Sequence, residues 1–350
     1  MNKLSFASDY SSGCHPLVLR RLTETNLCRS AGYGTDGFSE AAREKIRQCC
    51  LAPEADVFFL AGGTQSNAAV IGCMLKPWQG VISAETGHVC GHEAGAIEAG
   101  GHKVLPLPHR EGRLAAEDVR RLLEQFRADE AREHLVEPGM VYLSQPTEYG
   151  TLYSLRELTE ISGVCHAAGI PLYVDGARLA YALGCPENDV RLSDLARLCD
   201  AFYIGGTKCG ALFGEAVVFP RHDTVPHFFT MIKQRGALLA KGFVAGLQFD
   251  ALFTDGLYEQ IGRHGVAAAE RIRTGLSACG YPLFIEAPTN QVFPVLTPAQ
   301  AQALRQEIDM TFWEKLDEGR CVMRLAADWA TRDEDVDLLL DVFRRCADQG

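Results

Sequence analysis

Residues 171–178 read PLYVDGAR, a short apolar run of aromatic and branched side chains that ends on an aspartate and a glycine. Such a run predicts a buried β-strand. Before it, residues 155–168 carry apolar side chains at helical spacing, and after it residues 201–204 (AFYI) form another strand-like run. Strands that alternate with helices of this length predict βαβ crossovers and a parallel sheet covered by helices.

The same alternation extends outward over residues 51–250, which we expect to form one large cofactor-binding domain. Further strands are expected at 56–60, 81–83, 103–107 and 140–144, and further helices at 64–75 and 115–126. The predicted fold class is α/β, a three-layer sandwich around a mostly parallel sheet.

The two ends of the chain differ from this middle part. Residues 1–50 are expected to be an irregular segment that contributes to the active site, with a loop at 32–37. Residues 222–279 are predicted to be largely helical with a glycine-broken middle. Short strands are expected at 291–296 and 321–325, and helices at 298–308 and 333–347. Residues 251–350 are therefore predicted to form a smaller α+β C-terminal domain.

Composition excludes several classes of partner. The 350 residues include 34 basic and 45 acidic side chains, a net charge of −11, which argues against binding nucleic acid or an anionic membrane. No apolar run approaches the ~18 residues of a membrane span, and no signal peptide is recognisable, so a cytoplasmic location is expected. The thirteen cysteines lack zinc-site spacing and are expected to be reduced.

Three stretches that follow predicted strands contain side chains suited to chemistry. Residues 61–67 (AGGTQSN) precede a helix, whose free N–H groups favour an anion such as phosphate, although an ordinary glycine turn capped by Thr64 or Ser66 is the alternative. Asp175 ends a buried strand and needs a partner, which could be a pyridinium N–H, Arg178 or a metal; a helix N-cap role is the alternative. Lys208, flanked by glycines, could be a buried nucleophilic amine or an ordinary solvated lysine.

Together these three stretches provide the parts of a pyridoxal 5'-phosphate site: an anion cradle, a partner for the ring nitrogen and a Schiff-base amine. Their order resembles that of the threonine aldolase and aromatic amino acid β-eliminating lyase family, which has the aspartate aminotransferase fold (fold type I). The supporting residues span nearly the whole chain: Ser8-Asp9, residues 33–36 (YGTD), residues 88–95 and residues 323–325 (MRL).

The resemblance implies a role for several residues around the cofactor. Lys208 would hold pyridoxal phosphate covalently, and Asp175 would keep its ring nitrogen protonated. The phosphate would be bound by Gly63 and Thr64, with help from Lys241. His88 would stack on the ring, which makes a metal site at residues 88–92 (HVCGH) improbable, so no metal is expected.

The resemblance also implies how an amino acid substrate would be held. Arg178, which is expected to contact the cofactor too, and Arg324 would bind the carboxylate together with Ser8, since the planar guanidinium group matches a carboxylate. Many threonine aldolases have a histidine in the loop after the strand at 140–144, where this chain has Glu148. Glu148 or His88 could accept the substrate's hydroxyl proton.

The implied activity is retro-aldol cleavage of L-threonine, L-allo-threonine and related β-hydroxy amino acids to glycine and an aldehyde. The alternatives are β-elimination from an aromatic amino acid or a cysteine derivative, transamination, or a binding module that no longer uses the cofactor. The resemblance further implies a homo-oligomer, dimer or tetramer, with the active site at the subunit interface. Residues 234–246 are a candidate for part of that interface.

Overall fold

The computed structural model describes residues 3–347, and its centre is a seven-stranded sheet. The strands lie in the order β2 (Asp56–Leu60), β8 (Glu215–Phe219), β7 (Ala201–Gly205), β6 (Leu172–Asp175), β5 (Glu137–Ser144), β3 (Gln79–Ala84) and β4 (Val104–Leu107). β8 runs antiparallel to both of its neighbours, and the other pairings are parallel. The predicted mostly parallel sheet is confirmed, although the sequence analysis had no strand at β8.

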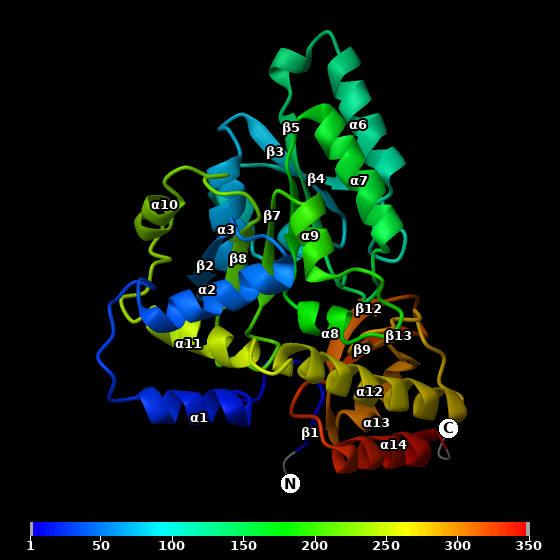
Figure 1. The fold of residues 1–350 in the computed structure, drawn as a ribbon. Helices are drawn as coiled ribbons and strands as arrows, with labels where there is room; N and C mark the ends of the chain where they lie inside the picture. Colours follow the sequence, from blue (N-terminus) through cyan, green and yellow to red (C-terminus); the bar gives the residue numbers. More distant parts are fainter. Residues whose placement is uncertain (1–2, 348–350) are drawn as a thin grey trace.

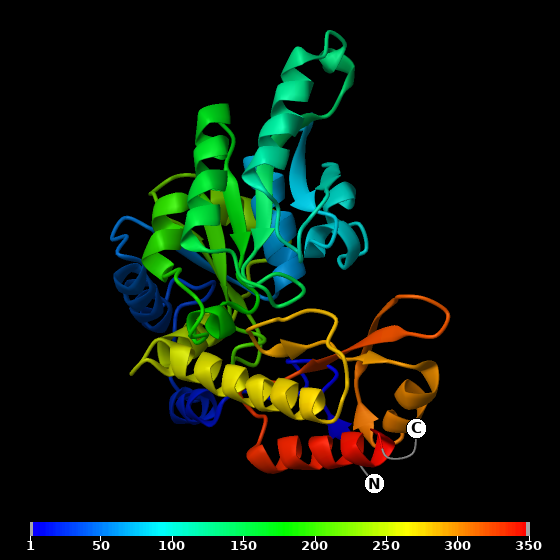
Figure 2. The same ribbon diagram turned by 90° about the vertical axis from the view of Figure 1, so that its right-hand side faces the viewer.

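Helices cover both faces of this sheet and complete three layers (Figures 1 and 2). One face carries α2 (Gly37–Cys50), α6 (Ala116–Ala128), α7 (Leu155–Ala168) and α9 (Leu192–Leu198), with the 3-10 turn Arg132–His134 after α6. The other carries α3 (Gly63–Met74), α4 (His88–Gly91), α5 (Ala96–Ala99) and α10 (Phe228–Gln234). Alternate side chains of each strand feed two separate cores: Val141 and Leu143 pack on one face, Met140 and Tyr142 on the other.

The prediction that residues 1–50 are irregular is wrong, because α1 (Pro16–Thr25) and α2 are regular helices. α2 begins where the Asp36 carboxylate accepts a hydrogen bond from the Ser39 backbone N–H at 2.9 Å, and it ends at Leu51 in the left-handed conformation. The glycines at residues 32–37 predicted a loop, and the role of Asp36 as the N-cap of a helix was missed. Residues 32–36 are a loop as expected, and Gly37 already belongs to the helix.

The C-terminal part combines helices with a small antiparallel sheet. Its elements are α11 (Phe243–Leu252), α12 (Leu257–Ala278), β9 (Gln291–Val292), β10 (Val295–Leu296), α13 (Pro298–Leu304), β11 (Ile308–Asp309), β12 (Thr311–Lys315), β13 (Cys321–Ala326) and α14 (Asp333–Ala347). The helix expected at 298–308 is shorter, because residues 308–309 pair with β1 (Leu4–Ser5) at the other end of the chain. The domain limits at residues 50 and 250 remain predictions.

α12 lies against both parts of the molecule, as Figure 1 shows, since it packs on α8 (Leu179–Leu183) and on α14. None of the helices within residues 3–347 combines the length and the apolar character that crossing a membrane requires. The contact between α8 and α12 is close because Gly262 has no side chain: a Cβ there would lie 1.8 Å from the Ala180 carbonyl oxygen.

We predict that Gly262→Ala lowers the free energy of unfolding by about 1–3 kcal/mol, because the two helices would have to move apart. Gly163→Ala on α7 is the matched control, since a Cβ there meets nothing within 4 Å and alanine favours a helix by up to about 1 kcal/mol. Urea denaturation of both variants measures the difference. Equal stabilities would contradict the close helix contact.

Candidate active site

A cavity of about 210 Å³ lies where the carboxyl ends of β2, β5, β6 and β7 meet, the edge at which sheets of this type bind ligands. It brings together most of the site residues predicted from the sequence. Its lining includes Gly63, Thr64, His88, Glu148, Asp175, Arg178 and Lys208, together with the unpredicted Ser144, Tyr203, Thr207 and Glu215.

One end of the cavity is the N-terminus of α3. The helix starts after Gly62 and has no side-chain cap, so the alternative of a turn capped by Thr64 or Ser66 is wrong. The backbone approaches closely here, because a Cβ on Gly63 would lie 3.0 Å from the Tyr203 hydroxyl oxygen. Free amide N–H groups at the positive end of a twelve-residue helix suit an anionic group such as phosphate.

The Asp175 carboxylate is buried at the end of β6 and is held by donors from three places. Its Oδ2 accepts from the Tyr142 hydroxyl at 2.6 Å and from Asn67 Nδ2 at 3.0 Å, and its Oδ1 accepts from the Ala177 backbone N–H at 2.9 Å. It does not cap α8, whose N-cap is Arg178. Burial alone would raise the pKa of Asp175, but the charge of His88 and these hydrogen bonds lower it below its usual value.

Lys208 follows β7 and lines the same cavity, so it is not a solvated loop lysine. Burial lowers the pKa of its amine, and the neighbouring Arg178 lowers it further, while Asp9 and Asp175 act in the opposite direction. A depressed pKa leaves more of the amine in the neutral, nucleophilic form.

His88 begins α4 and is held by a buried carboxylate that the sequence analysis missed. Its Nδ1 lies 2.8 Å from Glu93 Oε1, and Asn67 Nδ2 donates to the same oxygen at 2.7 Å. Asn67 thus connects Glu93 to Asp175. Asn67 and Glu93 stand 108 and 82 positions from Asp175 in the chain, so no local pattern indicated the contact.

Glu148 follows β5 and lies beside His88. Its Oε1 accepts from the Ser144 hydroxyl at 2.6 Å and from the His88 backbone N–H at 2.8 Å. Burial raises the pKa of this carboxyl above its usual value, although both hydrogen bonds oppose the rise.

The two arginines expected to bind a carboxylate have different surroundings. Arg178 Nε and Nη2 form a two-point ion pair with Asp9, at 2.6 and 3.0 Å, which leaves Nη1 outside that pair. Arg324 does not line the cavity; its Nη2 donates to the Ala7 carbonyl at 3.1 Å, and its buried Nε has no partner. Burial and the charge of Arg178 lower the pKa of Arg324 to about 10. Ser8 forms a hydrogen bond to Ser11 at 2.8 Å and does not line the cavity.

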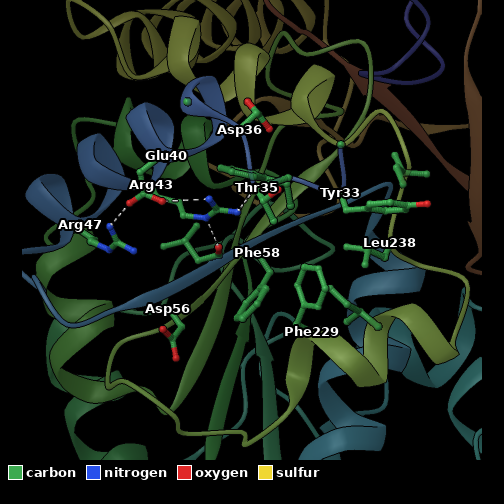
Figure 3. Close-up of a pocket in the computed structure, with 17 residues that line it drawn as sticks. Tyr33, Thr35, Asp36, Glu40, Arg43, Arg47, Asp56, Phe58, Phe229 and Leu238 are labelled. Atoms are coloured by element: carbon green, nitrogen blue, oxygen red, sulfur yellow. Dashed lines mark hydrogen bonds and ion pairs between the residues drawn. The ribbon is translucent and has the colours of Figure 1, made fainter. Parts of the chain in front are cut away.

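Lys241 is exposed and lies outside the lining of the cavity. Its segment packs on the loop at 32–36, where the Tyr33 N–H donates to the Ala240 carbonyl at 3.1 Å. Residues 33–37 line a different hollow of about 510 Å³, shown in Figure 3. Within it Arg43 donates to the Gly34 and Val57 carbonyls, at 2.6 and 2.9 Å, and pairs with Glu40 at 3.2 Å.

Among the residues that the structure describes, His88 and His92 do not form a metal site together. Its ring lies 6.1 Å from the Trp313 ring and 5.8 Å from the His88 ring, whose Nδ1 is taken by Glu93. Within residues 3–347, no cluster of three or more histidine, cysteine or acidic side chains is placed to hold a metal ion.

Comparison with known proteins agrees with this geometry. A family model described as beta-eliminating lyase matches residues 6–299. The chain belongs to the beta-eliminating lyase family. It is 31% identical to the low specificity L-threonine aldolase of Pseudomonas aeruginosa over 95% of this chain and 94% of that protein.

Two solved structures place this family member among known folds. The structure of Leishmania major threonine aldolase is 42% identical, covers 98% of this chain and 99% of its own, and superposes with a TM-score of 0.94. Aspartate aminotransferase from Thermus thermophilus with maleate is 16% identical, covers 99% and 92%, and has a TM-score of 0.72, which shows the fold alone. The fold is thus fold type I, and both family and fold are those of pyridoxal-phosphate enzymes.

In this beta-eliminating lyase family member, Glu215 supports the turn that carries Lys208. Its two carboxyl oxygens accept from the Gly206 backbone N–H at 2.9 Å and from the Thr207 hydroxyl at 2.8 Å. Burial raises the pKa of Glu215 to about 7, against a usual value of 4.5. The sequence analysis gave Glu215 no role.

We predict that Glu215 makes stability depend on pH. Because the pKa of Glu215 is higher in the folded chain than in the unfolded chain, Glu215 adds to the free energy of unfolding. This contribution is fully present below about pH 4.5 and is lost as the pH rises through about 7. Glu215→Gln removes this loss, so the stability of the variant relative to the natural chain should rise by on the order of 1–3 kcal/mol between pH 4.5 and 8. Any change in hydrogen bonding adds a constant offset, so the slope is the readout. If the free energies of unfolding of the variant and the natural chain changed with pH in parallel, Glu215 would not cause the pH dependence.

Proposed function

We propose that this protein is a pyridoxal-phosphate-dependent aldolase that cleaves L-threonine, L-allo-threonine and related β-hydroxy amino acids to glycine and an aldehyde. The observation that carries the proposal is one cavity lined by a lysine amine of lowered pKa, by an aspartate whose pKa is kept low and by an uncapped helix N-terminus. The full-length similarity to low specificity L-threonine aldolase and to Leishmania major threonine aldolase supports the choice of substrate.

The residues present fit the proposed cofactor at each of its parts. The amides of Gly63 and Thr64 would bind the phosphate, and the low-pKa amine of Lys208 would hold the aldehyde carbon. Asp175 would accept a hydrogen bond from the ring nitrogen, because its pKa is kept low despite burial. His88 would stack on the ring; 34% of its side chain is exposed.

The bound cofactor would supply an acceptor for the electron pair released when the Cα–Cβ bond of the substrate breaks. The protein would contribute position and proton transfer. Arg178 lines the cavity and has Nη1 outside its pair with Asp9, so it would bind the substrate's carboxylate. Arg324, whose buried Nε has no partner, and Ser8 lie outside the lining and would have to turn toward the carboxylate to assist. His88 and Glu148 lie next to each other, and either could receive the proton of the β-hydroxyl group.

We further propose that the protein forms a homo-oligomer in which Lys241 reaches the phosphate of a neighbouring subunit. Within residues 3–347, the lysine and arginine side chains that line the cavity are Lys208 and Arg178, and neither belongs to the helix end expected to hold phosphate. Exposed Lys241 lies on the segment 234–246, the candidate for part of the interface, and is absent from the lining of the cavity of its own chain. The size of the oligomer, measured in solution, would distinguish a dimer from a tetramer.

Products of the purified protein test the activity. With pyridoxal phosphate present, L-threonine should yield glycine and acetaldehyde in equal amounts, whereas pyruvate and ammonia from serine or tyrosine would indicate β-elimination instead. We expect Lys208→Ala to lose the visible absorbance band of the bound cofactor and at least about 1000-fold in turnover, because the nucleophilic amine is gone. Lys103→Ala, a change at an exposed residue directly before β4, should retain both. A Lys208→Ala protein that kept both properties would overturn this assignment.

Mixing two impaired variants tests the shared site. Lys241→Ala should weaken cofactor affinity about 10- to 100-fold, the loss of one charged hydrogen bond. When it is unfolded and refolded together with Lys208→Ala, a mixed pair contains one site with both lysines only if they come from different subunits. Activity above that of either variant at limiting cofactor is therefore expected. No recovery in confirmed mixed oligomers would place both lysines on one chain.

A further inference from the structure

A chain of hydrogen bonds connects His88 through Glu93 and Asn67 to Asp175, and Glu93 has no part in the function proposed above. Glu93 Oε1 receives both His88 Nδ1, at 2.8 Å, and Asn67 Nδ2, at 2.7 Å. Asn67 Nδ2 also donates to Asp175 Oδ2 at 3.0 Å. The Glu93 side chain is completely buried, and its second oxygen, Oε2, has no partner.

The orientation of the Asn67 amide is fixed by its neighbours. Its nitrogen lies between two carboxylates, which can only accept, and its oxygen accepts from the Tyr173 hydroxyl at 2.9 Å. The reversed amide would place an acceptor oxygen against both carboxylates and lose the hydrogen bonds to Glu93 and Asp175. Asn67 is itself fully buried, so water cannot replace them.

This orientation determines which nitrogen of His88 carries a proton. Since Glu93 Oε1 already accepts from Asn67, it is an acceptor toward His88 as well, and Nδ1 must be the donor. Even a proton on Glu93 would sit on the unpartnered Oε2. In the neutral ring Nε2 is then the free acceptor, and the exposed part of His88 belongs to the cavity lining.

We propose that Glu93 is the positioning residue of His88, fixing the ring with Nδ1 protonated and leaving Nε2 as the atom that takes the substrate's hydroxyl proton. The inference rests on the proposed aldol cleavage. In that step the O–H bond breaks and its proton moves to Nε2, the O–H electron pair forms the aldehyde C=O, and the Cα–Cβ pair remains with Cα. Cα then takes up a proton, which completes glycine.

The surroundings favour His88 over Glu148 for this proton. The Glu148 Oε1 already accepts two hydrogen bonds, from Ser144 and from the His88 backbone, whereas a positive His88 would lie against the Glu93 carboxylate, whose Oε2 has no partner. The other ring in contact, His92, lacks such a carboxylate partner. A carboxylate behind an imidazole both orients it and stabilises its charged form, as in serine hydrolases.

The test combines a tautomer measurement with kinetics on the full chain. In protein labelled with ¹⁵N-histidine, with and without added pyridoxal phosphate, His88 signals are assigned by their loss in His88→Asn. At alkaline pH we expect the natural chain to show Nδ1 protonated and Nε2 unprotonated. Glu93→Gln should keep this tautomer, because an amide oxygen can replace Oε1, and Glu93→Ala should lose it.

Kinetics separate orientation from charge. Glu93→Gln should lower kcat for L-threonine about 10- to 100-fold, a part of what acid–base catalysis supplies, while KM changes less than about twofold. Glu98→Gln removes the same charge from an exposed position five residues away and should leave kcat unchanged.

The possible results distinguish this inference from the proposed function. If no variant or natural chain cleaves a β-hydroxy amino acid, the proposed function fails, and the tautomer measurement still decides the role of Glu93. If Glu93→Ala keeps only Nδ1 protonated, or if Glu93→Gln retains full kcat in an active enzyme, Glu93 does not position His88 and the inference is overturned.

Discussion

The whole site depends on keeping a carboxylate ionised inside the protein. Removing Asp175 from water favours its neutral form, and the fold answers with an O–H group, an amide N–H and a backbone N–H from three separate segments. Tyr142 is part of the central strand β5, and Asn67 is part of α3, the helix whose N-terminus lines the cavity. This buried negative charge and the Lys208 amine line the same cavity.

Much of this arrangement could be predicted from local patterns. The alternation of strands and helical stretches gave the parallel core, because burial on both faces demands continuous apolar strands. Lys208, Asp175 and the stretch at Gly63 come directly after strands, and the carboxyl ends of parallel strands meet at one edge, so their proximity followed from topology. β8 has the branched, apolar residues of a strand and could have been predicted, but its antiparallel direction could not, because a hydrophobic pattern reveals neither direction nor partner. β11 was missed because two residues carry no periodicity.

The residues that hold the predicted ones in place could not be found in the same way. Asp9 meets Arg178 across 169 positions, and Glu93 meets Asp175 only through Asn67. Such contacts leave no trace in spacing, because they are made by distant segments that folding brings together. Glu215 lies only seven residues from Lys208, yet an acidic residue at the start of a strand ordinarily indicates a solvated strand end. In the folded chain Glu215 is buried and accepts hydrogen bonds from Gly206 and Thr207, and the sequence alone does not show this burial.

The first residues of the chain are tied to the last third. β1 pairs with β11, the Ala326 N–H donates to the Phe6 carbonyl at 2.8 Å, and Asn290 holds Asp9 at 3.0 Å. During synthesis on the ribosome the segment at residues 4–9 therefore has to wait for residues 290–326 before it can take its place. Until then Asp9 lacks the Asn290 amide that helps to hold it against Arg178, so the binding edge is finished only after that later segment has been made.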